Sequence, residues 1–336
     1  MSRVTTSLRR VRAEGFTPKE FRTICWFALL ALMIICVSGA AVRLTGSGLG
    51  CDDWPNCNND KLVDLSNKHA AIEQINRLFT FLVCIAVALA AAAGWYRRPR
   101  RKDLLVLGFV LLAGVPAQGV VGAIVVWADL NPATVQLHFV LSMVLVWAAV
   151  MMLVRSGEPD GGARVAAVVP RVRRRVAWLV VWTWITVLAG TVVTGTGPHA
   201  GDDRARRFFG EVKEVEGKLV EGVDGHALQW ASRIHGFIVW ITVAVALSLL
   251  WQLRRLRHDR KVLDAPITAW IITAGVQGTV GYVQYAAGLP VGMVLVHVAG
   301  ATTLMAVTAW LWCSTTRIVS PADALIADAT AEADRA

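Results

Sequence analysis

The sequence predicts an all-α integral membrane protein with eight transmembrane helices, arranged as two pseudo-symmetric four-helix bundles. Composition is one reason, because 55% apolar residues, 14 tryptophans and a positive mean hydropathy exceed what a soluble domain of 336 residues can bury. An internal repeat is the other reason. Side chains able to act as ligands recur 159 residues apart, in the pairs Asn76 and His235, Gln118 and Gln277, and His138 and His297.

The sequence around these pairs recurs as well. The run AQGVVGAIVVWADLNPATVQLHF, which begins at Ala117, is answered by VQGTVGYVQYAAGLPVGMVLVHV, which begins at Val276. This predicts a duplicated four-helix unit whose two copies run in the same direction. Transporters often contain internal repeats, but here no helix is interrupted by Pro or Gly at mid-membrane in both copies, which argues against that class.

Eight apolar segments are long enough to cross about 30 Å of hydrocarbon. In chain order they are residues 24–43, 73–96, 104–127, 134–154, 176–195, 231–253, 266–286 and 292–313. The first four belong to a predicted bundle of residues 23–155, and the last four to a second bundle of residues 176–314. We expect an N-terminal segment of residues 1–22, a linker of residues 156–175 and a tail of residues 315–336, all of them cytoplasmic.

Lysine and arginine predict this orientation, because cytoplasmic loops retain positive charge. They concentrate at the start of the chain and in the second, fourth and sixth connections, as Arg3, Arg9, Arg10, Arg12, Arg97, Arg98, Arg100, Arg101, Lys102, Arg171, Arg173, Arg174, Arg175, Arg254, Arg255, Arg257, Arg260 and Lys261. A multi-pass plasma-membrane protein with both termini in the cytoplasm is expected. The net charge of +10 therefore indicates no nucleic acid. The basic start runs into a full-length span, so we expect no cleavable signal peptide.

The six cysteines divide by depth. Cys51 and Cys57 lie in the first outer loop with five residues between them, on the side of the membrane where disulfides persist, so we expect them to be bonded. The bond is either a structural staple or a redox-active pair beside an intramembrane site. The remaining cysteines fall inside predicted spans and are expected to pack as small apolar side chains, namely Cys25, Cys36, Cys84 and Cys313.

Polar side chains gather near the outer end of the second predicted helix. Glu73, Asn76 and Arg77 share one helical face there. Ionisable groups at membrane depth indicate function, with an ion pair between Glu73 and Arg77 as the structural alternative. Arg233 stands at the corresponding level of the second copy. One arginine in each copy would suit a bound carboxylate, although arginines that snorkel from helix ends are ordinary too.

Three of the seven histidines lie in the helices of the predicted bundles. Imidazole inside a four-helix bundle is the usual axial ligand of heme iron. His235 and His297 would together give a six-coordinate iron. His138 has Asn76 as its repeat-related partner, and asparagine is a poor iron ligand. The alternative for each histidine is a hydrogen-bonded residue of the helical core.

A second motif follows the fifth predicted helix. The run GTGPHAGD, from Gly195 to Asp202, contains His199 and echoes TGSG, from Thr45 to Gly48. Its glycines permit close approach of the backbone to a flat ligand, or they simply end the helix.

Taken together, these residues resemble the heme A synthase family, in its cysteine-containing bacterial branch. The resemblance rests on VRLTGSGLGCDDWPNC from Val42, Glu73 with Arg77, GTGPHAGD, RIHG from Arg233, and His297, and it spans all eight helices. It implies an oxidoreductase that converts heme O to heme A by oxidising one methyl group to a formyl group through successive hydroxylations. The product would serve heme-copper terminal oxidases.

The resemblance also implies roles for individual residues. His235 and His297 match ligands of a tightly held heme b, and Arg233 lies beside them. His138 matches a ligand at the substrate heme, and Glu73 matches an acidic residue needed for catalysis. Cys51 and Cys57 match the cysteine pair of the branch, for which electron transfer or heme handover is expected. A heme O synthase and a quinone or other electron acceptor are the expected partners, and a homo-oligomer is left open.

One residue departs from the family pattern, because many members have histidine where this chain has Asn76. The amino-terminal site is therefore not expected to hold iron between two histidines. An iron bound by His138 alone keeps one accessible face. Asn76 is expected to hydrogen-bond a bound water or the side chain of the substrate. The rival reading is a diheme electron carrier between quinone and a partner protein, which would need no Glu73.

Overall fold

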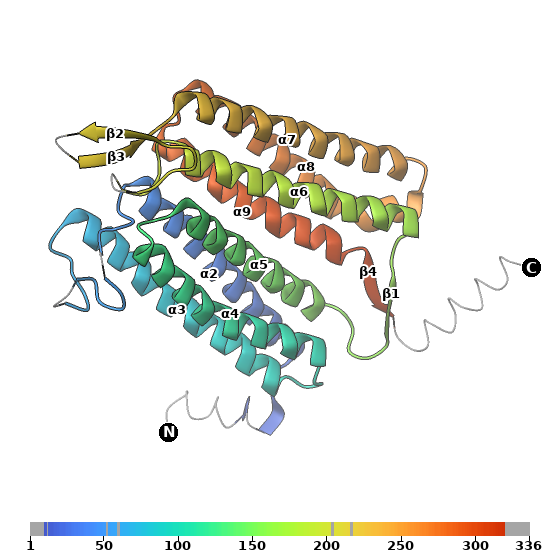
Figure 1. Ribbon diagram of the computed structural model, residues 1–336. Coiled ribbons are helices and arrows are strands. Elements are labelled where there is room, and N and C mark those ends of the chain that lie inside the picture. Colours follow the sequence, from blue (N-terminus) through green and yellow to red (C-terminus); the bar gives the residue numbers. More distant parts are fainter. Residues whose placement is uncertain are drawn as a thin grey trace, which may run out of the picture.

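The computed structural model describes residues 10–319, apart from residues 12, 52, 59, 60, 203, 204, 216 and 217. Eight long helices dominate this part of the chain (Figure 1). They are α2 (Pro18–Leu44), α3 (Lys68–Tyr96), α4 (Lys102–Trp127), α5 (Pro132–Ser156), α6 (Pro170–Thr196), α7 (Gly225–Leu253), α8 (Arg257–Ala286) and α9 (Val291–Cys313). The predicted all-helical architecture is confirmed. Residues 1–9 and 12 of the predicted N-terminal segment and residues 320–336 of the predicted tail lie outside the described residues.

Seven of these helices are long and apolar enough to span a membrane. The exception is α8, whose first turns carry charged residues and whose apolar part is diluted by Gln277 and Gln284. Large apolar side chains also face outward, and Phe81 and Phe237 are each 67% exposed. A soluble protein rarely exposes so much apolar surface, so the chain is a multi-pass membrane protein.

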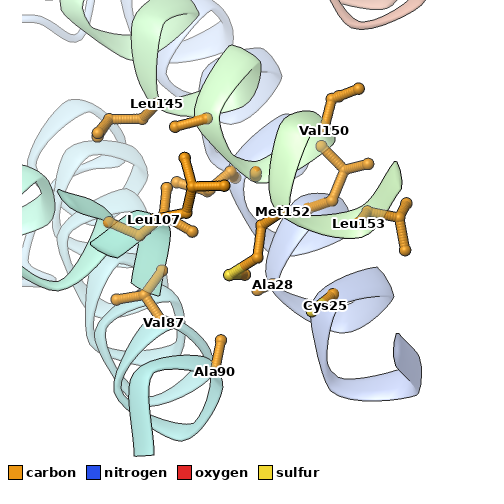
Figure 2. Close-up of a cluster of buried hydrophobic side chains, with 14 of the residues drawn as sticks. Cys25, Ala28, Val87, Ala90, Leu107, Leu145, Val150, Met152 and Leu153 are labelled. Carbon is orange, nitrogen blue, oxygen red and sulfur yellow. The ribbon is translucent and has the colours of Figure 1, made fainter. Parts of the chain in front are cut away.

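The first four helices pack in a ring. α2 packs against α3 and α5, and α4 packs against the same two helices. Helices α3 and α5 therefore occupy opposite corners. Figure 2 shows the apolar cluster between them, where Val87, Leu107 and Met152 converge from three helices. Burial of such side chains is what holds this half together inside the ring.

The last four helices follow a related but looser arrangement. α6 packs against α7 and α9, and α8 packs against α9, whereas α7 and α8 touch only slightly. Helices α7 and α9 again lie at opposite corners. The two halves meet where α9 packs against α2 and α5, and where α5 meets α6 (Figure 1).

The turn between α4 and α5 and the turn between α8 and α9 have matching backbone conformations. Leu130, between α4 and α5, has φ +54°, and Leu289, between α8 and α9, has φ +61°. The N–H of Leu130 donates to the Val125 carbonyl at 3.0 Å, and that of Leu289 donates to the Gln284 carbonyl at 2.7 Å. Leu130 and Leu289 stand 159 residues apart, as do Val125 and Gln284. The same offset separates His138 and His297, which follow these turns. The local repeat read from the sequence is thus present in the backbone.

Two short strand pairs were not predicted. β1 (Ala163–Ala166) pairs antiparallel with β4 (Thr316–Val319), and β2 (Glu211–Val215) pairs with β3 (Lys218–Gly222). They lie at opposite ends of the helices (Figure 1). The pair of β1 and β4 joins the predicted linker to the chain after α9. Strands of four or five residues carry too little alternation to stand out beside long apolar helices.

Candidate functional site

The carboxylate of Glu73 is buried near the start of α3, beneath the loop that follows α2. One of its oxygens, Oε2, accepts a hydrogen bond from the backbone N–H of Cys51 at 2.8 Å. The other, Oε1, accepts from Arg77 Nη2 at 2.7 Å and from Arg77 Nε at 3.2 Å. The ion pair offered as the structural alternative is therefore present, and Glu73 also contacts the disulfide loop directly.

Arg77 holds the same loop by donating hydrogen bonds to its backbone carbonyls. Its Nη1 donates to the Asn56 carbonyl at 2.9 Å and to the Asp53 carbonyl at 3.3 Å, while Nη2 donates to the Cys51 carbonyl at 3.4 Å. A planar guanidinium with five N–H donors can hold several acceptors at once. Arg77 thus ties α3 to the loop, a role that its spacing from Glu73 did not reveal.

Cys51 and Cys57 form the expected disulfide, and both are buried. Cys51 Sγ lies 3.8 Å from Gln74 Oε1, on the turn of α3 that carries Glu73. The loop comes so close to α3 that a Cβ on Gly50 would lie 2.4 Å from the His69 carbonyl oxygen. The bond therefore sits directly against the carboxylate. Whether it acts as a staple or a redox pair stays a prediction.

His138, His235 and His297 project from α5, α7 and α9, and their rings are largely buried. In each of them Nδ1 is buried and has no hydrogen-bond partner. A buried ring nitrogen without a partner is costly in a packed core. The hydrogen-bonded alternative is therefore not met at Nδ1 of any of the three rings.

Each of these imidazoles lies against a glycine of a neighbouring helix. A Cβ built on the glycine would lie 3.6 Å from His138 Cε1 for Gly122, 3.2 Å from His235 Cε1 for Gly190, and 3.2 Å from His297 Cε1 for Gly281. Gly122 and Gly281 stand 159 residues apart and follow the paired glutamines by four residues, so the repeat could have identified them. Because glycine has no side chain, it leaves room for each ring between the helices.

The paired glutamines hold the histidine-bearing helices from the adjacent helix. Gln118 Nε2 donates to the His138 carbonyl at 3.1 Å, and Gln277 Nε2 donates to the His297 carbonyl at 2.9 Å. Their identical role explains why glutamine recurs at both positions. They act on the backbone of the histidine, and the imidazole itself stays free.

Asn76 lies on α3 at the level where α7 carries His235. Its Oδ1 is 2.8 Å from the hydroxyl oxygen of Ser38 on α2. The opposite corner of this half is occupied by α5, which carries His138. At these repeat-related positions the amino-terminal half thus has one imidazole, His138, whereas the carboxy-terminal half has two, His235 and His297.

This donor set fits heme better than a bare metal ion. Among the described residues no group of three or more His, Cys, Asp or Glu side chains converges on one point. A metal that brings four equatorial nitrogens of its own needs only one or two axial imidazoles. The unpartnered nitrogens and the glycines against the rings both suit such a planar complex.

Arg233, on the same helix as His235, and His199 make contacts of their own. The Arg233 guanidinium lies 5.4 Å from the Trp230 ring centre and has no carboxylate partner in the described part of the chain, so it is available to an anion. His199 Nε2 lies 2.8 Å from the Leu289 carbonyl oxygen. His199 is thereby engaged in holding the second outer turn.

Arg43 was not singled out from the sequence, although it lies inside the VRLTGSGLG run. Its Nε donates to the His199 carbonyl at 2.9 Å. Beside it, the N–H of Gly48 donates to the Gly201 carbonyl at 2.9 Å. The two glycine motifs therefore meet between the halves.

Comparisons with known proteins agree with this site. Residues 22–309 match the COX15-CtaA family, described as cytochrome oxidase assembly protein. A heme A synthase of Bacillus cereus strain G9842 is 27% identical over 317 residues, covering 88% of this chain and 94% of the relative. A heme A synthase of Bacillus mycoides strain KBAB4 is 26% identical over 305 residues, covering 86% and 92%. Because the family match extends over most of the sequence, this chain belongs to the COX15-CtaA family of cytochrome oxidase assembly proteins.

Proposed function

We propose that this protein is a heme A synthase, which oxidises one methyl group of heme O to the formyl group of heme A. Two successive hydroxylations would carry the methyl carbon to a geminal diol, and loss of water would leave the aldehyde. The single observation that carries the proposal is the set of three buried imidazoles with unpartnered Nδ1 atoms, each against a glycine. The family membership supports the same activity.

The carboxy-terminal half is proposed to hold a resident heme b between His235 and His297. Such a heme, once bound, supplies one-electron redox chemistry. Support comes from the position of α7 and α9 at opposite corners and from the buried, unpartnered Nδ1 atom of each ring. Arg233 would bind a propionate, because its guanidinium has no acidic partner among the described residues and planar anions suit its forked geometry.

The amino-terminal half is proposed to bind the substrate heme through His138. Glu73 would accept protons from the methyl group under oxidation or stabilise positive charge there. Its two oxygens are held by the Cys51 N–H and by Arg77, so the carboxylate keeps one orientation. Arg77 would act by holding the loop, which excludes water from the buried carboxylate.

Topology and partners follow from the same proposal. The two halves would be related by a pseudo-two-fold axis along the membrane normal, which the matching turns at Leu130 and Leu289 support. The basic connections favour a plasma-membrane protein with both termini in the cytoplasm. A heme O synthase would supply the substrate, and a quinone or another acceptor would take the electrons.

Pigment extraction tests the proposal. The protein is expressed with a heme O synthase and purified, and every extracted heme is identified by chromatography. We expect heme A or its hydroxylated precursor, and we expect both to be lost in Glu73→Gln while bound heme O remains. Recovery of heme b alone, with heme O supplied, would contradict the synthase and would favour an electron carrier.

A further inference from the structure

Three arginines line a pocket at one end of α6 and α7. The pocket has a volume of about 220 Å³ and lies where α6 begins and α7 ends, at the end opposite β2 and β3 (Figure 1). Its lining residues are Arg171, Arg175, Trp251, Gln252, Arg255 and Leu256. His235 lies roughly 24 Å back along α7 from Trp251. The pocket is therefore separate from the histidines of this half.

The positive charge of this pocket is not balanced by the protein. No carboxylate lines it, and none of its three arginines forms an ion pair with a described residue. Asp259, on the neighbouring α8, is engaged elsewhere, because its Oδ2 accepts from the Val169 N–H at 3.2 Å and its Oδ1 lies 3.3 Å from His258 Nδ1. Like charges around one cavity repel each other, and an anion between them removes that repulsion. Charge thus favours an anion in this pocket.

Polar side chains of the pocket point to the same kind of ligand. Arg175 Nη1 donates to the Ser248 carbonyl, which joins α6 to α7 beside the pocket and leaves other N–H groups of Arg175 as donors. Gln252 Oε1 is buried and has no hydrogen-bond partner in the described part of the chain. A buried acceptor without a donor costs free energy. An anion that also carries a hydroxyl group would satisfy both features.

Exposed apolar side chains lead away from the pocket along both helices. On α7, Leu247, Trp251 and Arg255 follow each other at four-residue spacing and so share one face, on which Leu247 is 59% and Trp251 60% exposed. On α6, Arg175 is followed three residues later by the exposed Trp178. Tryptophan is enriched where the membrane meets water. The sequence of charge, tryptophan and apolar surface matches a lipid, whose charged headgroup is joined to apolar chains.

The other half does not repeat this arrangement. The positions 159 residues before Trp251 and Arg255 hold Ala92 and Tyr96 on α3. Tryptophan and arginine at this place are therefore not a consequence of the duplicated fold. They distinguish the carboxy-terminal half.

We propose that this pocket binds the headgroup of an anionic phospholipid, with its phosphate between Arg171, Arg175 and Arg255. Guanidinium groups bind phosphate oxygens through paired, charge-assisted hydrogen bonds, and basic pockets between transmembrane helices suit lipid headgroups. A glycerol headgroup would donate a hydroxyl to Gln252, and the acyl chains would lie along the exposed faces of α6 and α7. The inference goes beyond the proposed function and does not depend on it.

Native mass spectrometry of the full-length protein in detergent tests the site. The purified, delipidated protein is titrated with dioleoyl phosphatidylglycerol or dioleoyl phosphatidylcholine at an ionic strength of about 0.15 M, where exposed charges more than about 8 Å apart are screened. We expect one phosphatidylglycerol to bind roughly 100-fold more tightly than phosphatidylcholine, at about fivefold for each arginine. Millimolar inorganic phosphate should leave the lipid bound. Displacement by phosphate would assign the pocket to a free anion instead.

Matched double variants locate the binding. Arg171→Gln with Arg255→Gln removes two charges from the pocket, whereas Arg174→Gln with Arg254→Gln removes two exposed charges that do not line it. The guanidinium groups of Arg254 and Arg255 lie 6.0 and 5.9 Å from the Trp251 ring centre, so the control also matches that contact. We expect the preference for phosphatidylglycerol to fall roughly 25-fold in the pocket variant. It should fall less than about threefold in the control.

The outcomes distinguish a built site from general attraction. Equal losses in the two double variants would overturn the proposal, because net charge alone would then explain the binding. A wild type that binds both lipids equally would overturn it as well. Arg255→Gln alone, with an expected loss of about fivefold, serves if the double variant does not fold. Pigments extracted from the same samples report the activity separately, since lipid preference is measured without turnover.

Discussion

The smallest side chains decide how the histidines of this protein stand. Each imidazole lies against glycine, and at Gly190 and Gly281 an added methyl group would lie closer to the ring than ordinary van der Waals contact. Glu73 shows the complementary case, in which a charged side chain is held by a backbone N–H and by Arg77 instead of by solvent. The glycines thus position the histidines by leaving space for their rings, whereas hydrogen bonds position the Glu73 carboxylate.

Gly190→Ala and Gly281→Ala are expected to weaken retention of the heme proposed for the carboxy-terminal half. The new Cβ would lie 3.2 Å from His235 or His297, and overpacking of this kind costs about 1–3 kcal/mol. Alanine improves helix propensity, so a loss would not come from the helix itself. The measurement is heme released to excess apomyoglobin, followed by absorbance.

Gly122→Ala is the matched control for that prediction. Its Cβ would lie 3.6 Å from His138 Cε1, which is ordinary van der Waals contact. The heme proposed for the carboxy-terminal half should then dissociate as in the wild type. Equally fast loss in all three variants would show that the contacts with the histidines are not the cause.

At the scale of elements, the connection between α5 and α6 is held by two buried arginines, Arg97 and Arg101, which lie in the connection between α3 and α4. Arg97 is only 1% exposed, and its Nη1 lies 2.8 Å from Asp160 Oδ1. Arg101 donates to the Arg155 carbonyl at the end of α5 and pairs with Asp103. Basic residues from which the orientation is predicted therefore also join these ends of the helices.

Asp160→Ala is expected to lower the midpoint of thermal unfolding in detergent. It leaves the buried Arg97 charge without its partner, which costs about 3 kcal/mol or more. Arg10→Ala serves as the control, because the pair of Arg10 and Glu20 is exposed to solvent and its loss should change the midpoint little. Similar midpoints for the two variants would mean that the Arg97 pair does not hold the connection.

At the scale of the whole molecule, the two halves form a continuous structure. Their helices pack through α9, which touches α2 and α5, and their outer ends meet where Gly48 donates to Gly201. Gly201 has φ +111°, and a Cβ there would lie 2.9 Å from Leu130 Cδ1. The two glycine motifs are therefore the junction of the halves at this end.

Gly201→Ala is expected to destabilise both halves together. Backbone strain at positive φ costs about 1–3 kcal/mol, and contacts with Leu130 and Arg43 add to it. Gly161→Ala is the control, since Gly161 has φ +87° but nothing within 4 Å of its Cβ. We expect a larger fall in the unfolding midpoint for Gly201→Ala and loss of both heme signals. Loss of one signal only would contradict a junction shared by both halves.

Local pattern was sufficient for much of the fold. The eight helices follow from runs of apolar residues, and the ion pair of Glu73 with Arg77 follows from four-residue spacing on one helix. The bond of Cys51 with Cys57 follows from two nearby cysteines in one outer loop. α8 is the weaker case, because its polar residues dilute the apolar signal on which the prediction depends.

By itself the sequence determined the helices and the local repeat, and it pointed to the histidines now proposed to hold heme, because periodicity and spacing along one chain encode them. Only the tertiary structure decided which glycine lies against each histidine, that Arg77 holds loop carbonyls, and that Ser38 is paired with Asn76. These contacts join helices at separations that follow no local period. They are fixed by close packing, where one methyl group or one hydroxyl determines what fits.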